Sequence, residues 1–566
     1  MKSLASATFA LILFAGVIAC AKNHTAAGAH RLATESRAMN MQADASSSAS
    51  SSPSAPPAVI LDTTYPRTEG RTIAVRGGAN GADRLQAAFN QAAPGDVIVL
   101  DAGAQFVGNF TISSKPDASG KWLIVRSSAA NKLPADARVS PGDASLMPKL
   151  ISPNADAALK TAPGAHHVRF VGIEFAVAPN WPTNYGLVLF GDGGSAQTEI
   201  QQVPHDLILD RCYIHGNATS NLRRGVGLNS ARTAIIDSYI ADCHEVGADA
   251  QAVCGWNGPG PFKIVNNYLE GAGENFMLGG ADPSIKELIP SDIEFRRNTL
   301  SKPLAWKTGH PSYAGKHWSV KNLFELKNAR RVLIDGNLME NCWVDGQVGF
   351  AVQLTPRNQD GAAQWCTVED VTMTNNIVRH AAGGINILGH DDNHPSGQAR
   401  RILIRNNLFE DIGGPQWSGN GRFLQVSDSD AVVVDHNTIL HSGNIITAHG
   451  KPNANFFFTN NLMAHNEYGI IGDSASVGLV TIRQYFPNGV FKKNVIAGGR
   501  SAIYPPDNFF PASLDEVRFT DRAHSSYGLS PASPYRNAAT DGKPIGCDVS
   551  ALETALPVTR AAQAAR

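Results

Sequence analysis

Three charged residues in one short segment have the types and spacing that proton-transfer chemistry needs. In KNLFELKN, the residues Lys321, Glu325 and Lys327 fall on one side of an extended chain. An amine such as Lys327 can abstract a proton next to a carboxylate once the negative charge of that carboxylate is offset. The segment therefore predicts Lys327 as the catalytic base of a β-elimination in a uronic acid, with Glu325 beside it. A surface ion pair between the two residues is the alternative.

A second group of candidate residues lies in the loop segment LGHDDNH and in TPRN. His390 changes its charge near neutral pH and is the alternative catalytic base. Asp391 and Asp392 offer hard oxygen ligands, so this loop is predicted to bind Ca²⁺ as a cofactor. Arg357 can hold a substrate carboxylate through two parallel hydrogen bonds. For each of these four residues, an ordinary solvated loop side chain is the alternative.

An internal repeat positions these residues. Each copy of the repeat starts with a hydrophobic residue. Counted from that residue, a second hydrophobic residue stands at position +2, a polar residue at +5 and a third hydrophobic residue at +7. Complete copies place the polar residue at Asn267, Asn298, Asn337, Asn376, Asn407, Asn437 and Asn461, and looser copies place Ile173, Cys212, Ser238 and Asn494 at that point. Each copy contains alternating strands without a helix for a crossover, so parallel strands must be joined by coiling.

The recurring Asn has a physical role in such a coil. Asparagine tolerates the left-handed turn conformation, and its amide can both donate to and accept from copies above and below. A buried column of Asn side chains is therefore satisfied by stacking. The sequence predicts an all-β protein, a right-handed parallel β-helix of about eleven coils.

The ends of the repeat region agree with this architecture. An amphipathic segment from Ala82, with Leu85, Ala88 and Phe89 on one side, predicts a helix that caps the first coil. The cap, FVGNFTI from Phe106, the Asn repeats and a terminal SPASPYRNAATDGKPIGCD together resemble the pectate-lyase-like right-handed parallel β-helix superfamily. The resemblance covers roughly residues 58–552 and implies the fold. It leaves the reaction open, because the superfamily includes lyases, glycoside hydrolases, esterases and non-enzymatic proteins.

The third strand of each coil is expected to present one polar column outward. Its members are Gln251, Met277, Glu325, Gln353, Asn386, Gln425 and Thr447, flanked by Lys327, Thr355, Ser427 and His449. A long hydrogen-bonding face suits an extended glycan. The predicted substrate-binding residues are Gln251, Lys321, Gln353, Arg357, Asn386, Gln425, His449 and Trp318, whose ring is expected to carry a sugar. Residues Glu245, Asp249 and Glu274, with the loop 307–317, are the next candidates.

These observations favour a polysaccharide lyase that acts on an anionic, uronate-containing glycan. A hydrolase of the polygalacturonase type is the alternative, although only Gly389-His390-Asp391-Asp392 partly matches its motifs and neither NTD nor RIK occurs. A non-catalytic glycan-binding surface protein is the third hypothesis. Lys and Arg total 48 against 49 Asp and Glu, a net charge of −1, which argues against a nucleic-acid binder. A monomer is expected.

The first residues predict export. An apolar stretch over residues 4–19 is too short to span a membrane and ends at Cys20, as in a signal peptide covering residues 1–20. Val17-Ile18-Ala19-Cys20 resembles a bacterial lipobox, which implies lipidation of Cys20; an ordinary signal peptide is the alternative. The expected location is a membrane-anchored lipoprotein, periplasmic or at the cell surface, or a secreted protein.

The remaining chain divides by composition. Residues 21–57 are rich in Ser, Ala and Pro and are predicted to be a disordered linker, residues 58–552 the β-helix domain and residues 553–566 a C-terminal tail. The cysteines after Cys20 are Cys212, Cys243, Cys254, Cys342, Cys366 and Cys547. Cys243 with Cys254, or Cys342 with Cys366, are candidate disulfides, and small buried side chains are the alternative.

Overall fold

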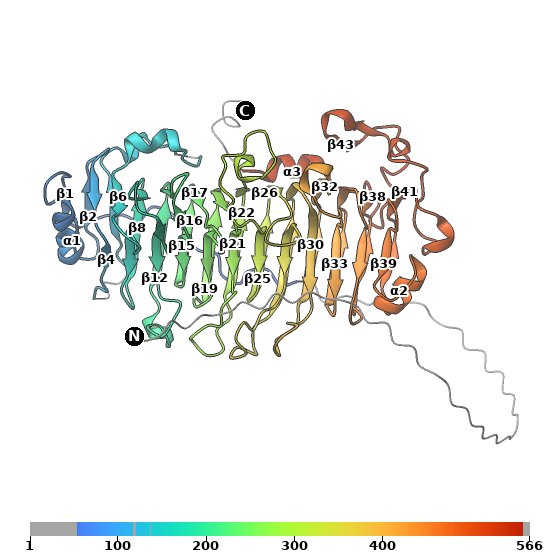
Figure 1. The fold of residues 1–566 in the computed structure, drawn as a ribbon, viewed down its shortest axis with the longest axis horizontal. Helices are drawn as coiled ribbons and strands as arrows, with labels where there is room; N and C mark the ends of the chain where they lie inside the picture. Colours follow the sequence, from blue (N-terminus) through green and yellow to red (C-terminus); the bar gives the residue numbers. More distant parts are fainter. Residues whose placement is uncertain (1–53, 117–119, 136, 558–566) are drawn as a thin grey trace, which may run out of the picture. The chain divides into compact units, whose positions relative to one another are not determined.

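The computed structural model describes residues 54–116, 120–135 and 137–557. Its strands are organised in three long parallel sheets, called A, B and C, that run the length of a solenoid (Figure 1). In each coil the chain passes through sheet A, then B, then C, before it starts the next coil. The predicted right-handed parallel β-helix is confirmed.

The strand bounds follow the coils in order. Sheet A contains β1 (Thr72–Val75), β2 (Val97–Leu100), β5 (Leu123–Ser127), β8 (His166–Val171), β12 (His205–Asp210), β16 (Ala231–Ile236), β19 (Gly260–Val265), β22 (Ser291–Arg296), β25 (Ala329–Asp335), β28 (Val368–Thr374), β31 (Arg400–Arg405), β34 (Asp430–Asp435), β37 (Phe457–Thr459) and β40 (Val490–Lys492). Sheet B contains β3 (Gln105–Val107), β6 (Lys149–Ser152), β9 (Glu174–Val177), β13 (Tyr213–His215), β17 (Tyr239–Cys243), β20 (Tyr268–Gly271), β23 (Thr299–Ser301), β26 (Leu338–Cys342), β29 (Ile377–Ala381), β32 (Leu408–Ile412), β35 (Thr438–His441), β38 (Leu462–Ala464) and β41 (Val495–Ala497).

Sheet C carries the predicted substrate face. It contains β4 (Phe110–Ile112), β7 (Leu159–Thr161), β11 (Val188–Phe190), β15 (Arg224–Leu228), β18 (Gln251–Gly255), β21 (Glu274–Leu278), β24 (Asn322–Leu326), β27 (Phe350–Leu354), β30 (Gly383–Leu388), β33 (Leu424–Ser427), β36 (Ile446–Ala448) and β39 (Ile470–Gly472). Two short pairs lie outside these sheets: β10 (Thr183–Asn184) with β14 (Asn221–Leu222), and β42 (Phe519–Asp521) with β43 (Ser526–Leu529). Sheet A contains 14 strands, sheet B 13 and sheet C 12. The number of coils is therefore larger than the eleven that the sequence predicts.

The predicted column of buried Asn side chains is present at the turn between sheets A and B. The backbone N–H of Asn376 donates to Oδ1 of Asn407 at 2.9 Å, and Nδ2 of Asn376 donates to the same oxygen at 2.9 Å. The same contacts link Asn337 to Asn376 and Asn407 to Asn437. The prediction placed the left-handed backbone conformation at the stacked Asn itself. The structure places it at the residue before, for example at Asn375 (φ 57°) before Asn376. The side-chain amide of the stacked Asn points into the core.

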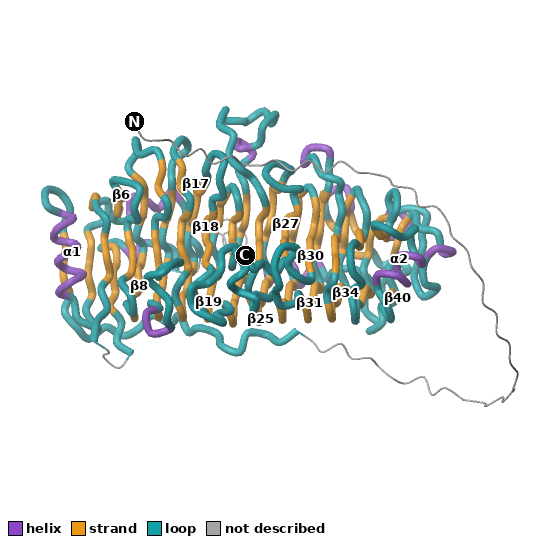
Figure 2. The backbone as a smooth tube through the Cα atoms, turned by 60° about the horizontal axis from the view of Figure 1, so that its bottom comes forward, coloured by secondary structure: helices purple, strands orange, loops and turns teal. Residues whose placement is uncertain are grey.

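Helices close both ends of the hydrophobic core (Figure 2). At the first coil, α1 (Gly81–Gln91) buries Leu85, Ala88 and Phe89, as predicted. At the last coils, α2 (Leu479–Tyr485) buries Ile482 and Tyr485 against the same core. The open hydrophobic ends that a solenoid would otherwise expose are thereby covered.

The chain after β41 runs back over the middle coils and ends in α3 (Val549–Ala555). Leu552 of this helix packs with Leu408 of β32. The carbonyl oxygen of Ala555 approaches Gly336 so closely that a Cβ at position 336 would lie 2.3 Å from it. The helix therefore continues past residue 552, the predicted end of the domain.

The segment before β1 lies across the outer face of sheet A and is called the strap (residues 54–66). The backbone N–H of Ala55 donates to Oδ1 of Asp370, and that of Ala58 donates to Oδ1 of Asp292. The described part of the predicted linker, residues 54–57, is thus bound to the β-helix. The strap crosses the strands from β28 back toward β8.

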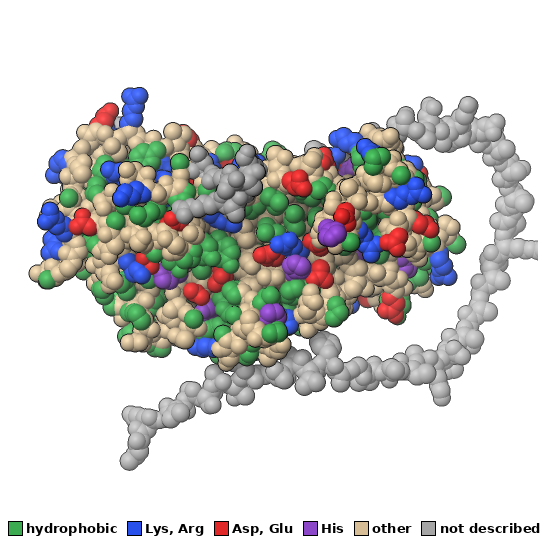
Figure 3. Space-filling model, turned by 90° about the horizontal axis from the view of Figure 1, so that it is seen from above, with side chains coloured by type: hydrophobic (Ala, Val, Ile, Leu, Met, Phe, Trp, Pro, Cys, Tyr) green, Lys and Arg blue, Asp and Glu red, His purple; other side chains and the backbone are tan. Residues whose placement is uncertain are grey.

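All six described cysteines are buried free thiols, so the alternative to the disulfide hypothesis holds. Burial raises the pKa of Cys212 and of Cys342 to about 12. Among the described residues, no helix combines the length and the apolar character needed to cross a membrane. On the coloured part of the face in Figure 3, basic and acidic side chains are interspersed, in keeping with the near-zero net charge.

Candidate active site

Sheet C presents the predicted polar column on its outer face. Its strands pair in register through Met277, Glu325, Gln353, Asn386, Gln425 and Thr447. The amides are linked along the solenoid, because Nδ2 of Asn386 donates to Oε1 of Gln353 at 2.7 Å and Nε2 of Gln425 donates to Oδ1 of Asn386 at 3.2 Å. Arg422 continues the series by donating to Gln425 at 2.8 Å. The column repeats at the spacing of the coils, about 4.8 Å.

Gln251 is not in this column, contrary to the prediction. Its register partner is Glu274, which pairs in turn with Asn322, whereas Met277 pairs with Cys254. The prediction relied on strict alternation, but the neighbours Ala252 and Val253 are both buried. Two consecutive buried residues remove the alternation that would reveal which side chains face outward.

Gln251, Glu274, Asn322 and Glu325 form a buried group at the start of this face, called the carboxylate–amide cluster. Nε2 of Gln251 donates to Oε2 of Glu274 at 2.8 Å, and Nδ2 of Asn322 donates to Oε2 of Glu325 at 3.1 Å. All four residues are at most 3% exposed. Oε1 of Gln251 and Oδ1 of Asn322 are buried without a hydrogen-bond partner among the described residues. The cluster therefore contains two carboxylates and two unengaged amide oxygens.

The carboxylate of Glu274 is buried close to two other carboxylates. Burial, with Glu325 and Asp249 nearby, raises the pKa of Glu274 to about 7, and Lys321 opposes this shift. Lys321 itself is committed to Asp249, since its Nζ lies 2.6 Å from Oδ2 of that residue. A buried excess of oxygen donors is what a hard cation requires.

The turn that carries Glu274 is held by a buried lysine. Nζ of Lys302 donates to the backbone carbonyl oxygens of Gly271, Ala272 and Gly273 and to Oδ1 of Asn275. Burial lowers the pKa of Lys302 below its usual value. The sequence did not indicate this residue, because nothing in the repeat marks the position directly after β23 as buried.

Lys327 lies at the opposite edge of the cluster. Its Nζ is 3.0 Å from Oε1 of Glu325, and its side chain is 18% exposed against 2% for that of Glu325. On the preceding coil a glycine turn makes room for it: a Cβ at Gly279 would lie 2.8 Å from Cβ of Lys327, and Gly279 has φ 91°. Lys327 is thus the solvent-accessible end of a chain of contacts that begins in the buried cluster.

Arg357 follows Lys327 one coil along, since its backbone N–H donates to the carbonyl oxygen of Lys327 at 2.9 Å. Its Nη1 lies 2.6 Å from Oδ1 of Asp391. Oδ2 of Asp391 accepts from the backbone N–H of Asn358, and the side chain is fully buried. Both carboxylate oxygens of Asp391 are therefore engaged, while Asp392 is exposed.

The two predicted histidines lie farther along sheet C. Nδ1 of His390 is 2.9 Å from Oδ2 of Asp428, which also binds Lys451 at 3.1 Å. His449 is half-buried, its Nε2 has no hydrogen-bond partner among the described residues, and burial lowers its pKa. Both histidines border the same face as Lys327, but His390 belongs to a separate charged group.

Trp318 is not exposed, which corrects the prediction that its ring carries a sugar. It is 2% exposed and stacks on His244 with ring centroids 3.7 Å apart. Trp306 meets the same imidazole edge-on at 5.2 Å. Trp306 and Trp318 of the long insert pack with Trp343 and Trp417 of later coils in a small additional core.

Sequence reasoning also missed Asn322 and Gln347. Oε1 of Gln347 accepts from Nε2 of Gln353 at 3.1 Å and from Nδ2 of Asn322 at 3.3 Å, so it joins the column to the cluster. Gln347 lies in a loop without periodicity, and no pattern could have located it. Asn322 lies in the segment KNLFELKN, between Lys321 and Glu325. Only the polar character of that segment pointed to a role for Asn322. Cys20 lies outside the described residues.

The chain was compared with known proteins. No family model and no curated protein matches the sequence. Among solved structures, the PL6 family alginate lyase AlyGC is similar over 86% of this chain and 58% of its own, with 13% identity and a TM-score of 0.44. The GH87 α-1,3-glucanase from Streptomyces thermodiastaticus strain HF3-3 is similar over 77% and 70%, with 12% identity and a TM-score of 0.46. Pectate lyase Pel9A is similar over 85% and 96%, with 12% identity and a TM-score of 0.37.

Proposed function

We propose that the protein is a polysaccharide lyase that cleaves an anionic, uronate-containing glycan by β-elimination on the outer face of sheet C. The observation that carries this proposal is the position of Lys327 at the accessible edge of the buried carboxylate–amide cluster, next to a hydrogen-bonded polar column. The column supplies donors and acceptors for successive sugars. Lys327, whose side chain is 18% exposed at the edge of the cluster, supplies a base.

The β-elimination requires a base, a proton donor and a group that holds the substrate carboxylate. Nζ of Lys327, as the free amine, takes the proton from C5 of the uronate, the electron pair forms the C4–C5 double bond, and the C4–O bond breaks. The protonated Lys327 returns a proton to the leaving oxygen. Arg357, one coil along, holds the substrate carboxylate and limits the negative charge that develops on it. Gln353, Asn386 and Gln425 hold the neighbouring sugars.

Calcium is proposed at the carboxylate–amide cluster in preference to Asp391 and Asp392. The carboxylates of Glu274 and Glu325 and the unengaged oxygens of Gln251 and Asn322 fit a cation that takes six to eight oxygen ligands. Bound there, Ca²⁺ would add positive charge that favours an anionic substrate.

The test is incubation of the purified protein with pectate, alginate and glycosaminoglycans. The absorbance of the unsaturated uronate product should rise with at least one of them. It should not rise with the Lys327→Ala variant, provided that the circular dichroism spectrum of the variant is unchanged. If no anionic glycan gives this product, the lyase proposal is wrong.

A glycoside hydrolase is the second candidate, because the pKa of Glu274, raised to about 7, would keep a carboxylic acid protonated beside Glu325. A protonated and an ionised carboxyl group are the pair that glycoside hydrolysis uses. New reducing ends without the absorbance of an unsaturated product would identify this reaction. Glycan binding without either product would identify a non-catalytic binding protein.

Export and lipid attachment at Cys20 complete the proposal. The membrane would hold the enzyme at the cell surface or in the periplasm, where extended glycans are reached. Support comes from the sequence of residues 1–20 alone.

A further inference from the structure

Three histidines and an aspartate gather on the outer face of sheet A, far in sequence from the candidate active site. His166 and His167 begin β8, and His205 and Asp206 begin β12, with His166 and His205 in register. His167 and Asp206 both adopt left-handed backbone conformations, with φ of 54° and 53°. This interrupts the alternation of the two strands, so both members of each pair project from the same face.

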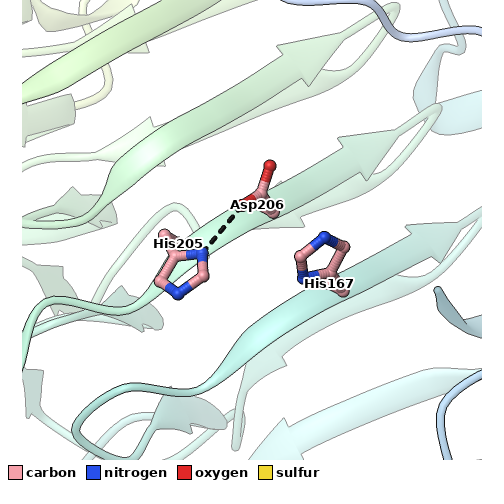
Figure 4. A group of neighbouring side chains, drawn as sticks. All are labelled: His167, His205 and Asp206. Atoms are coloured by element: carbon pink, nitrogen blue, oxygen red, sulfur yellow. Dashed lines mark hydrogen bonds and ion pairs between the residues drawn. The ribbon is translucent and has the colours of Figure 1, made fainter. Parts of the chain in front are cut away.

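The four side chains are in direct contact. The imidazoles of His166 and His205 stack with centroids 5.0 Å apart, and the ring of His167 stands edge-on to both. Nδ1 of His205 lies 2.7 Å from Oδ2 of Asp206. The rings of His167 and His205 lie on either side of the Asp206 carboxylate (Figure 4), and one ligand-type atom from each of the three residues lies within 4.8 Å of the others.

His166 supports this group from outside. Its Nε2 lies 3.0 Å from the carbonyl oxygen of Lys115, and a carbonyl only accepts, so this nitrogen carries the proton. Nδ1 of a neutral His166 is then an acceptor, and it lies 2.9 Å from Nδ1 of His167, which must donate. The contact fixes the tautomer of His167 with Nε2 as the nitrogen that holds a lone pair. A second histidine that orients the first in this way is typical of the outer shell of a metal site.

The carboxylate of Asp206 is engaged on both oxygens. Asp206 is 8% exposed, and its Oδ2 lies 2.7 Å from Nδ1 of His205. Nε of Arg232 donates to Oδ1 at 2.8 Å, so an incoming cation must share this carboxylate with a guanidinium. His205 is 38% exposed in its side chain and can turn to close the remaining gap.

A cavity of about 410 Å³ adjoins the group. It is lined on one side by His167, Asp206 and Trp122 and on the other by strap residues that include Tyr65. The cavity gives solvent a route to the group and leaves room for a water molecule or a small anion as a further ligand.

We propose that His167, His205 and Asp206 bind one borderline divalent transition-metal ion such as Zn²⁺, with His166 as a positioning residue. Imidazole nitrogens suit zinc, copper and nickel, whereas calcium and magnesium prefer all-oxygen sites. The chain would then hold two cations of different chemistry, an oxygen-bound ion under the sheet C face and a nitrogen-bound ion at sheet A.

The test is equilibrium dialysis of the full-length protein against Zn²⁺, with Co²⁺ absorption spectra as a second readout. Wild type should bind one more Zn²⁺ ion than His167→Ala or His205→Ala at the same free concentration, and Asp206→Asn should bind it about tenfold to a hundredfold more weakly. His24 and His30 are present in every variant, so they do not affect the difference. Excess Ca²⁺ should not displace the ion.

His524→Ala is the matched control, because His524 and Asp521 form an exposed imidazole–carboxylate pair of 2.8 Å without a second histidine ligand. It should leave the stoichiometry unchanged. Equal Zn²⁺ binding by wild type and the double variant His167→Ala/His205→Ala would overturn the proposal. So would loss of the ion in the presence of Ca²⁺. Melting curves without metal identify any variant that fails to fold. If the histidine variants fail to fold, the affinity of Asp206→Asn for Zn²⁺ tests the proposal.

Discussion

Nζ of Lys327 lies 3.0 Å from one carboxylate oxygen of Glu325, and the other oxygen of Glu325 accepts a hydrogen bond from Asn322 at 3.1 Å. One carboxylate thus connects an accessible amine to a buried group of oxygen donors. A change in the buried group is transmitted to the amine through a single side chain. The predictions for the active face follow from this arrangement.

Replacement of Lys327 by Ala should lower kcat on the cleaved glycan by at least about a hundredfold, because the base is lost. Lys327→Arg should be nearly as inactive, since a guanidinium keeps the charge but does not give up its proton. Lys451→Ala removes an exposed lysine near the same face and should leave kcat unchanged. Full activity of Lys327→Ala would place the base elsewhere, with His390 as the next candidate.

Calcium removal by a chelator should reduce turnover, and added Ca²⁺ should restore it. Asn322→Leu removes one unengaged oxygen from the cluster and should raise the Ca²⁺ concentration for half-maximal activity by about tenfold or more. Asp392→Asn tests the site predicted from the sequence and should leave that concentration unchanged. The reverse pattern, with only Asp392→Asn affected, would move the cation to the loop.

Asn376→Leu should lower the free energy of unfolding by about 3 kcal/mol although the volume is nearly conserved. The substitution removes the acceptor of the backbone N–H of Asn337, one of the two acceptors of its side-chain amide, and the donor to the carbonyl oxygen of Ile334, in a site that is 0% exposed. Asn386→Leu makes the same change on the outer face of sheet C, in β30. It should lower the free energy of unfolding by much less. Denaturant titrations of the two variants give the comparison, and equal stabilities would contradict the role of the buried ladder.

Stability should fall in acid because of His244. This imidazole is fully buried against Trp318, and burial lowers its pKa from 6.5 to about 3. Between these values the unfolded chain binds a proton that the folded chain does not, so stability is complete above pH 6.5. From pH 6.5 down to about pH 3, the free energy of unfolding falls by about 1.4 kcal/mol for each pH unit. His244→Phe should flatten the dependence of the melting temperature on pH, and exposed His524→Phe should not.

Cys20→Ser should abolish labelling by radioactive palmitate and release the protein from the membrane fraction. The expected effect rests on the apolar stretch that ends at Cys20. Unchanged processing, labelling and fractionation in the variant would show that residues 1–20 act as an ordinary signal peptide.

The fold was predictable because its determinants are local and repeated. Asn376 and Asn407 stand at equivalent points of two copies, and register follows directly once these copies are superposed. The copies of the repeat found in the sequence do not include the coils that contain β2 and β5. The column on sheet C was predictable for the same reason as the fold, through the alternation of strands such as β33, in which Gln425 lies between buried Leu424 and Val426.

The site was predictable only where it lies on strands. The pairing of Arg357 with Asp391 joins two loops on different coils, and neither loop has a period that reveals the contact. Trp318 is buried in a cluster with Trp343 and Trp417 of later coils, so its burial depends on how the insert folds back onto them. Loop side chains are placed by long-range packing, and the repeat carries no information about them.

The strap gives the domain an unusual order of assembly. Oγ of Ser54 lies 2.7 Å from Oγ1 of Thr372, a contact between residues 318 positions apart. During synthesis the strap emerges first, yet it has no surface to dock on until β28 and its neighbouring coils exist. Closing so long a loop is a late step in any folding pathway. The earliest residues of the domain are therefore among the last to reach their native partners, and they fasten coils that have already formed.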